Sequence, residues 1–134
     1  MFRNFEQLQP EQCRVILAGY MLLLLVLSLI PSDQSLPFKY RFHLNPELQN
    51  LGHIPAYMIL GFLWLHFIEK QKIVRNTAFY VFASASGYGI VNELLQVFVP
   101  GRFFSVLDIL FNVMGVLLGI MLFRCYTKMH KRPI

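Results

Sequence analysis

Charged residues are scarce in this sequence, and the common marks of soluble enzymes are missing from it. Asp, Glu, Lys and Arg make up 14% of its 134 residues, whereas an average soluble domain is about 25% charged. Its two cysteines, Cys13 and Cys125, lie near opposite ends of the chain and outside any zinc-binding spacing. No P-loop and no glycine-rich dinucleotide fingerprint occurs. We therefore expect no metal and no cofactor, and we predict that both cysteines are buried free thiols rather than a disulfide.

Apolar residues are correspondingly abundant. They make up 56% of the chain, and phenylalanine alone occurs 13 times. A soluble fold of this length has too little interior for so much apolar surface. The net charge of +5 comes from basic residues at the ends of apolar segments, which is typical of membrane topology rather than of nucleic-acid binding. The composition predicts a small membrane protein that forms a single domain, residues 1–134, contacts membrane lipids and binds no nucleic acid.

Four apolar segments are candidates for transmembrane helices, and nothing in the sequence indicates strands. They cover residues 15–30, 53–68, 77–99 and 105–126. Pro31 ends the first segment, and Pro100-Gly101 indicates a turn between the third and the fourth. No small-residue cleavage pattern follows Ile30, so the first segment is an uncleaved anchor rather than a signal peptide. We predict an all-α polytopic bundle of four transmembrane helices, with a frayed basic tail over residues 127–134.

Lysine and arginine are unevenly distributed between the two ends of these segments. Nine lie on the side shared by the two termini and the connection 69–76, and three lie on the other side. The positive-inside rule then places both termini in the cytoplasm. With this orientation, the polar residues that open the second and fourth segments and close the third lie together in the outer half of the membrane.

Helical periodicity groups these polar residues with small ones on one face of each segment. The faces are Asp108, Asn112, Gly115 and Gly119 on the fourth segment, Ser86, Gly89, Glu93 and Gln96 on the third, and His53 with Tyr57 on the second. We assign the small residues Ser86, Gly89, Gly115 and Gly119 to helix packing. The glycine pair of the fourth segment is either an internal contact or a contact between two copies of the chain in a homo-oligomer.

The polar residues of these faces, with an arginine in the outer turn, are candidates for a ligand-binding pocket that opens outwards. They are His53, Tyr57, Glu93, Gln96, Arg102, Asp108 and Asn112. A charge within a span costs about 2.5–3.5 kcal/mol on insertion scales, and buried ion pairs are poor sources of stability, so a function is the favoured explanation. Structural explanations stay open: Glu93 and Arg102 can form an ion pair, and Asn112 can hydrogen-bond across helices. His53 and Tyr57 can be interfacial residues.

In this order and spacing, the motifs resemble the VanZ-like family. They are H-x-x-x-Y at His53 and Tyr57, E-x-x-Q at Glu93 and Gln96, P-G-R at Pro100 to Arg102, and S-x-x-D-x-x-x-N-x-x-G-x-x-x-G from Ser105 to Gly119. The resemblance covers about half of the chain and implies a multi-pass protein of the bacterial cell envelope, in the inner (cytoplasmic) membrane. The family is named for a protein associated with teicoplanin resistance. Members often carry an acidic-basic pair shortly before the histidine, where this chain reads Gln49-Asn50-Leu51-Gly52, so the resistance role transfers poorly.

Three functions are compatible with this reading of the sequence. The first is a module that binds or shields an anionic envelope lipid or cell-wall precursor, with Arg102 as the fork that holds phosphate or carboxylate. The second is an intramembrane enzyme acting on a lipid-linked precursor, with Glu93 as general base, His53 as acid or relay, and Arg102 as the stabiliser of developing charge. The third is a small transporter or flippase. Because no nucleophile motif occurs, the sequence favours binding.

Overall fold

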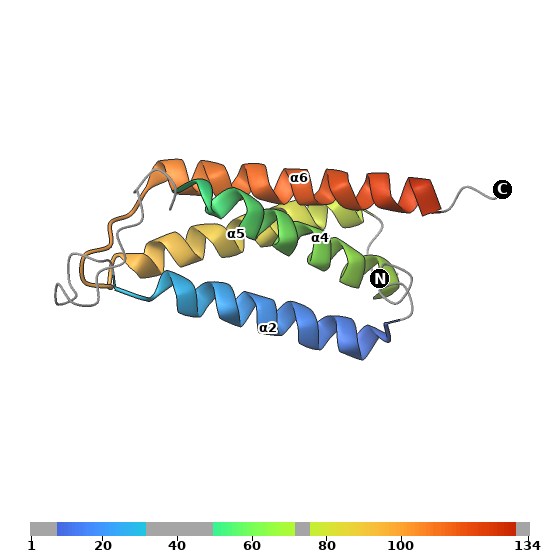
Figure 1. The fold of residues 1–134 in the computed structure, drawn as a ribbon, viewed down its shortest axis with the longest axis horizontal. Helices are drawn as coiled ribbons and strands as arrows, with labels where there is room; N and C mark the ends of the chain where they lie inside the picture. The colour runs from blue at the N-terminus through green and yellow to red at the C-terminus, as the bar shows by residue number, and fades with distance from the viewer. Residues whose placement is uncertain (1–7, 32–49, 72–75, 131–134) are drawn as a thin grey trace.

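The computed structural model describes residues 8–31, 50–71 and 76–130, and it is all-helical over these residues (Figure 1). Its helices are α2 (Pro10–Ser28), α4 (His53–Gln71), α5 (Thr77–Gln96) and α6 (Val106–His130). No strand occurs in the described ranges, so the all-α prediction is confirmed for them. Successive helices run in opposite directions, which brings the ends of α2 and α5 beside the starts of α4 and α6 (Figure 1). The predicted loop 31–52 lies largely outside the described residues. Of the predicted connection 69–76, residues 69–71 are instead the end of α4, which continues past the predicted residue 68, and residues 72–75 lie outside the described ranges.

The first helix begins earlier than the predicted residue 15, because the polar segment before it is itself helical. Pro10 occupies the start of α2, where its missing N–H is not needed and its fixed φ suits a helix. The backbone N–H of Gln9 donates to Gln12 Oε1 at 2.9 Å, which gives one otherwise free donor at this end a partner. Residues 10–14 of the segment 1–14 thus belong to α2, residues 8 and 9 precede the helix, and residues 1–7 lie outside the described residues.

The last two helices differ from the predicted spans at their ends. α5 stops at Gln96 instead of residue 99, and the chain then turns through Gly101, whose φ of 76° is the left-handed conformation that favours glycine. α6 continues to His130, so the prediction of a frayed tail is wrong for residues 127–130. Thr127 Oγ1 donates to the carbonyl of Arg124 at 3.1 Å, and basic side chains in this region favour the helix C-terminus.

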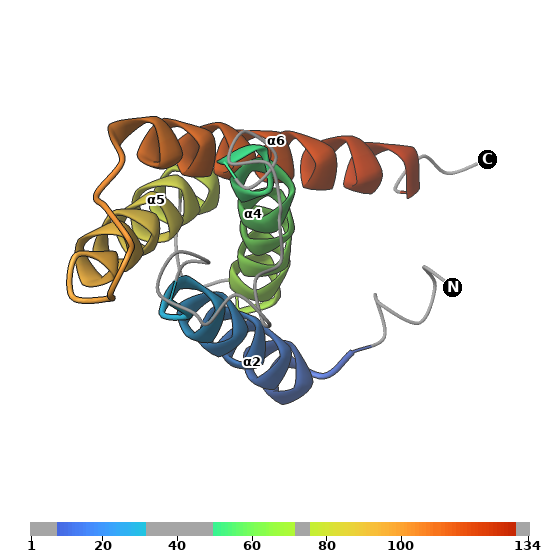
Figure 2. The ribbon, with the colours of Figure 1, turned by 60° about the vertical axis from the view of Figure 1, so that its left-hand side comes forward.

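The helix α4 lies at the centre of the bundle and packs against the other three (Figure 2). Its contact with α6 is close because glycines replace side chains on both helices. A Cβ added to Gly115 would lie 2.5 Å from the carbonyl oxygen of Ile54, and one added to Gly119 would lie 2.1 Å from that of Met58. On α4, a Cβ on Gly61 would lie 2.7 Å from the α6 backbone. The Gly115/Gly119 face is therefore an internal contact, covered by α4, and a contact between copies would need another face.

The helix α2 is attached more lightly, and tyrosines hold it. Tyr20 Oη donates to the carbonyl of Ala56 on α4 at 2.9 Å, and Tyr88 on α5 donates to the carbonyl of Met21. The residues of α2 that are buried are Cys13, Leu17 and Leu24. Both cysteines are free thiols, as predicted, but the prediction of burial is wrong for Cys125, which faces outwards on α6.

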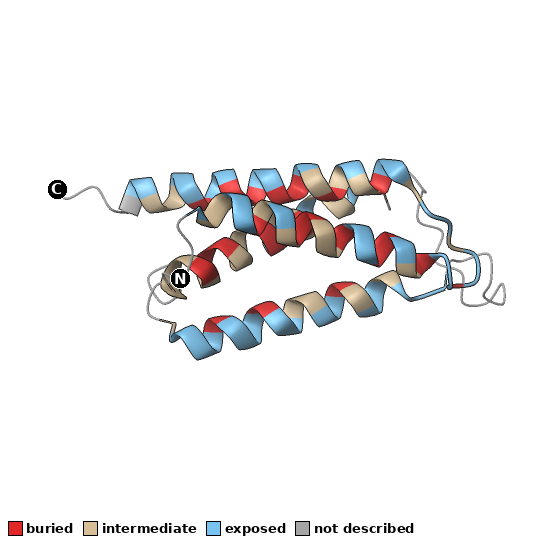
Figure 3. Ribbon diagram, turned by 180° about the vertical axis from the view of Figure 1, so that it is seen from behind, coloured by how far each residue is buried: buried red, intermediate tan, exposed pale blue. Residues whose placement is uncertain are grey.

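The outer surface of the bundle is apolar on every helix. Figure 3 shows the buried residues as stripes that face the inside of the bundle, while the exposed positions face outwards. Large apolar side chains occupy many of these exposed positions, including Val15 on α2, Phe79 on α5 and Met121 on α6, which are 69%, 66% and 61% exposed. The helices α2 and α6 are each long and apolar enough to cross a bilayer. α4 and α5 carry more polar residues, and those of α5 are mostly on its buried face.

Candidate functional site: a polar pocket at one end of the bundle

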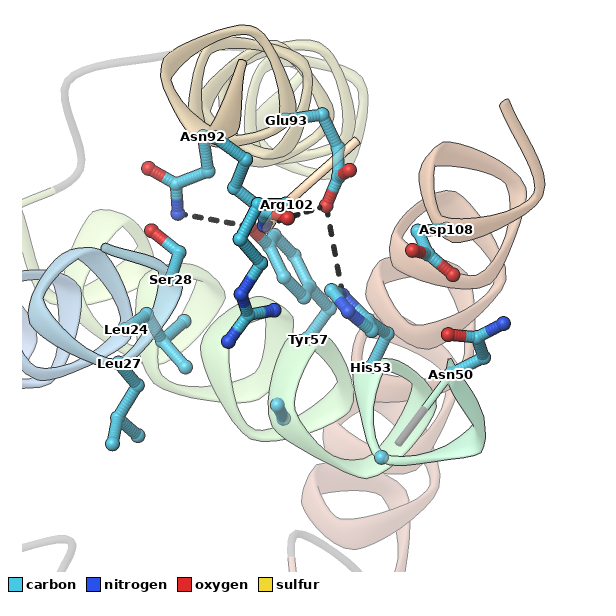
Figure 4. Close-up of a pocket in the computed structure, with 13 residues that line it drawn as sticks. Leu24, Leu27, Ser28, Asn50, His53, Tyr57, Asn92, Glu93, Arg102 and Asp108 are labelled. Carbon is cyan, nitrogen blue, oxygen red and sulfur yellow. Dashed lines mark hydrogen bonds and ion pairs between the residues drawn. The ribbon is translucent and has the colours of Figure 1, made fainter. Parts of the chain in front are cut away.

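A pocket lies at the end of the bundle where α2 and α5 finish and α4 and α6 begin (Figure 4). Its volume is about 260 Å³. The lining residues come from distant parts of the sequence. They meet here because successive helices run in opposite directions. The polar residues of its lining are Ser28, Asn50, His53, Tyr57, Asn92, Glu93, Gln96, Arg102 and Asp108. α2 contributes two apolar residues to the lining, Leu24 and Leu27, beside Ser28.

His53 sits at the first position of α4 and joins the three inner helices at the pocket. Its Nδ1 lies 2.8 Å from Asn112 Oδ1 on α6 and 4.0 Å from Glu93 Oε1 on α5. The first contact is a hydrogen bond in which the ring N–H donates to the amide oxygen. The second is an ion pair when the imidazole is protonated. Asn112 is fully buried and lies one helical turn from Asp108, so one face of α6 supplies both groups.

Glu93 is the most deeply buried charged residue of the described chain, with 0% of its surface exposed. Gln96, one turn further along α5, donates from Nε2 to Glu93 Oε1 at 3.1 Å. Asp108 is 8% exposed and occupies the first turn of α6. Its backbone N–H donates to Ser105 Oγ at 3.2 Å, so Ser105 caps the helix and fixes where Asp108 lies. One atom from each of His53, Glu93 and Asp108 lies within 4.8 Å of the other two.

Several buried polar atoms in and beside the pocket have no hydrogen-bond partner among the described residues. They are Asn92 Oδ1, Glu93 Oε2, Asp108 Oδ1 and Asn112 Nδ2. Buried polar groups are nearly always paired, and a cluster of exceptions requires an explanation. Desolvated carboxylate oxygens are costly to leave without a partner. The unpaired oxygens of the pocket can therefore accept a hydrogen bond from a bound donor or bind a cation.

Arg102 does not form an ion pair with Glu93, which was the structural alternative for these two residues. Its Nε donates to the carbonyl of Ile30, just beyond α2, at 3.1 Å. Within the described residues the ion pairs are Glu11 with Arg14, and His53 with Glu93 when His53 is charged. Figure 4 shows the guanidinium between α2 and α4, on the opposite side of the pocket from Asp108. The sequence could not predict this contact, because the acceptor is a backbone carbonyl of a distant segment.

Sequence reasoning missed two contributions to the site. Asn92 lies beside the polar face of the third segment, yet its Nδ2 donates to Tyr57 Oη at 3.1 Å, and both residues are buried. The presence of a polar amide within an apolar segment could have marked Asn92 as a residue of the site. The apolar wall from α2 carries no such signal, since Leu24 and Leu27 resemble every other leucine of that helix. The predicted packing residues Ser86 and Gly89 are both buried on α5, and a Cβ on Gly89 would lie 3.0 Å from the Tyr57 ring.

Comparison with known proteins finds one family. The family model described as VanZ/LLP1 matches residues 16–127. No curated protein and no solved structure matches the chain. The matched range runs from α2 to near the end of α6 and includes every residue of the pocket named above.

Proposed function

The chain belongs to the VanZ/LLP1 family, and from this premise we propose that it binds the anionic head group of an envelope lipid or cell-wall precursor. The observation that carries the proposal is the two-sided lining of the pocket. His53 and Gln96 offer nitrogen donors on the side of α4 and α5, and Arg102 lies on the α2 side, beside the apolar wall that Leu24 and Leu27 form. An amphiphile needs both, a polar place for its head and an apolar path for its chain.

The size of the pocket favours a head group over a whole molecule. Its volume of about 260 Å³ is slightly below the range of about 300–1,000 Å³ in which drug-sized ligands bind. A phosphate, a pyrophosphate or the carboxylate end of a peptide stem needs less room than that. Arg102 is suited to such groups, because its Nε is fixed by Ile30 and the rest of its planar fork has no partner among the described residues.

We further propose that all four helices cross the cytoplasmic membrane of a bacterium, with both termini inside and the pocket near the outer face. The apolar outer surface of α4 and α5 supports this placement, because their polar residues point into the bundle and lipid would meet mainly apolar side chains. α2 and α6 satisfy the length and hydropathy of a span by themselves. In this arrangement a precursor bound at the pocket would be shielded from an extracellular glycopeptide, which is how a resistance role could arise.

The proposal is tested by Arg102→Gln in protein reconstituted into lipid nanodiscs, with a short-chain polyprenyl phosphate as the probe. Loss of a hydrogen bond to a charged group costs about 1.5–3 kcal/mol, so we expect the Kd to rise about tenfold to 150-fold. Arg102→Lys keeps the charge without the planar fork and should lie between the two. Arg124→Gln, an exposed arginine near the other end of the bundle, is the matched control. Full affinity in Arg102→Gln would remove the basis of the proposal.

A second candidate function is an intramembrane enzyme acting on the same kind of lipid-linked precursor. The 4.0 Å approach of His53 to Glu93 favours it, since the two groups can exchange a proton with a small movement. Glu93 would act as the base and Arg102 would stabilise negative charge on the substrate. Incubating the purified protein with lipid-linked precursors and following them by mass spectrometry separates the two functions. Unchanged precursors support binding, and a product that Glu93→Gln abolishes supports catalysis.

A further inference from the structure

Three helices each contribute one metal-ligating side chain to the same corner of the pocket. His53 opens α4, Glu93 lies on the last turns of α5, and Asp108 lies in the first turn of α6. One ligand atom from each lies within 4.8 Å of the others. Ligands on opposite sides of a divalent ion are about 4–5 Å apart, given metal–oxygen distances of about 2.0–2.6 Å. We propose that His53, Glu93 and Asp108 bind a divalent transition-metal ion, Mn²⁺ or Zn²⁺.

The unpaired oxygens of the site are a separate observation that supports a cation. Glu93 Oε2 and Asp108 Oδ1 are buried without a hydrogen-bond partner among the described residues, and their side chains are 0% and 8% exposed. Isolated buried carboxylates are among the most costly groups in a protein interior unless they are paired or coordinate a metal. A divalent ion between them would satisfy both oxygens at once.

The surroundings of His53 resemble the outer shell of known metal sites. A ligating histidine usually donates its second ring N–H to a carbonyl or carboxylate oxygen, which fixes the tautomer and the ring orientation. Here Asn112 Oδ1 lies 2.8 Å from His53 Nδ1 and is itself fully buried, so Nε2 is the ring nitrogen left to bind the metal. Gln96 Nε2 donates to Glu93 Oε1 at 3.1 Å and so orients the second ligand. Asn112 and Gln96 are therefore positioning residues, and the three ligands leave other coordination positions open.

The nature of the ligands selects the class of metal. One imidazole nitrogen with two carboxylates is a mixed set, in which the imidazole suits Zn, Cu, Fe and Ni, while the carboxylates suit Mg, Ca and Mn. Zn²⁺ and Mn²⁺ accept both imidazole and carboxylate ligands, and they keep open coordination positions for a further ligand. Sequence spacing did not predict this site, because the ligands lie on three different helices.

A bound cation also deepens the proposed function, on which this step rests. Two ionised carboxylates and one guanidinium give the pocket one net negative charge, which repels an anionic head group. A bound divalent ion would change the net charge of the pocket from negative to positive. The head group's oxygens can then complete the coordination of the metal on one side while Arg102 contacts them on the other. The acidic residues thus become part of anion binding instead of opposing it.

The experiment measures metal binding to the full-length chain in nanodiscs without any lipid-phosphate probe. After removal of metal with a chelator, Mn²⁺ is titrated and followed by the EPR signal of the free ion, and Zn²⁺ is titrated by calorimetry. We expect one saturable equivalent per chain. Glu93→Gln and Asp108→Asn should each weaken binding by more than about 100-fold, and Asn112→Ala by about 10- to 100-fold, as for outer-shell partners. Glu11→Gln, an exposed carboxylate at the other end of the bundle, is the matched control and should bind as the parent does.

The proposal is overturned if the parent shows no saturable equivalent of either ion, or if both carboxylate variants bind like the parent. Should those variants fail to fold, pulsed EPR of the Mn²⁺-loaded parent decides, since it must show coupling to one imidazole nitrogen. Binding of the polyprenyl phosphate with and without chelator separates this proposal from the proposed function. Metal binding without phosphate binding refutes only the function, and phosphate binding that the chelator leaves unchanged refutes only the metal's role in it.

Discussion

Replacing Gly115 by alanine tests whether close contact between α4 and α6 builds the pocket. The added methyl group would lie 2.5 Å from the carbonyl oxygen of Ile54 and 2.9 Å from Tyr57 Cβ. Side-chain carbons essentially never approach other atoms closer than 3.0 Å, so the two helices must separate locally by about 0.5 Å. Ile54 directly follows His53, and Asn112 lies one turn before Gly115. The same separation therefore pulls apart the 2.8 Å contact of His53 with Asn112.

The size of the effect follows from two opposing contributions. Forcing an extra methyl group into a packed interface typically costs about 1–3 kcal/mol. Alanine is also the better helix former, by about 1 kcal/mol in water, which partly offsets that cost. Gly87→Ala on α5 carries the propensity gain alone, because a Cβ there meets nothing within 4 Å. The difference between the two variants is therefore the packing cost, and we expect Gly115→Ala to be less stable than Gly87→Ala by about 1–3 kcal/mol.

The measurement is unfolding of both variants and the parent in the same detergent micelles, together with affinity for the polyprenyl phosphate probe. Gly115→Ala should lose both stability and affinity, and Gly87→Ala should keep both. If Gly115→Ala is as stable as Gly87→Ala, α4 and α6 do not pack closely at Gly115. If it loses stability but binds the probe normally, the pocket does not depend on this contact.

Three further predictions concern hydrogen bonds and topology. Tyr57→Phe removes the acceptor of the buried Asn92 amide and should destabilise the protein by about 1–3 kcal/mol in micelle unfolding; an added Asn92→Leu that fails to recover any stability would contradict this. Tyr20→Phe removes a hydroxyl that bonds to the α4 backbone and should cost about 0.5–1.5 kcal/mol, and an unchanged stability would show that this hydrogen bond does not hold α2. In a cysteine-free chain, a cysteine at Phe103 should react with an impermeant maleimide in intact cells and one at Lys128 only after permeabilisation. The reverse pattern would invert the proposed orientation.

Much of the fold was predictable because it depends on local signals. Apolar length alone located four helices, and Pro100-Gly101 correctly indicated a turn, since Gly101 adopts a φ that other residues avoid. Helix ends were less predictable. α6 extends to His130 with a side-chain hydrogen bond from Thr127 to the carbonyl of Arg124 inside the helix, whereas composition alone indicated a frayed tail there.

The main residues of the site were predictable because helical periodicity shows which residues share one face of a helix. The stripes of polar and small residues placed His53, Glu93 and Asp108 on inward faces, and the structure brings these three together. Pairing was not predictable. Periodicity gives the face of a helix and not the residue that it contacts, so charge alone suggested Glu93 as a possible partner of Arg102, whereas the hydrogen bond of Arg102 goes to Ile30. The proposed metal site was not predicted for the same reason, and from the sequence alone no metal was expected.

On α6 the residues of the site and the residues of packing are one continuous stripe. Asp108 and Asn112 form the part of the stripe nearest the start of α6. Gly115 and Gly119 continue it along the same face, against α4. The glycines let α4 approach closely enough for His53 to reach Asn112, so packing sets the distances on which binding depends. A substitution scored only by loss of function would therefore assign the glycines to the binding site. Measuring stability together with affinity separates the two roles. A substitution of a binding residue such as Asp108 should lower affinity while stability stays the same or rises. A substitution of a packing glycine should lower both.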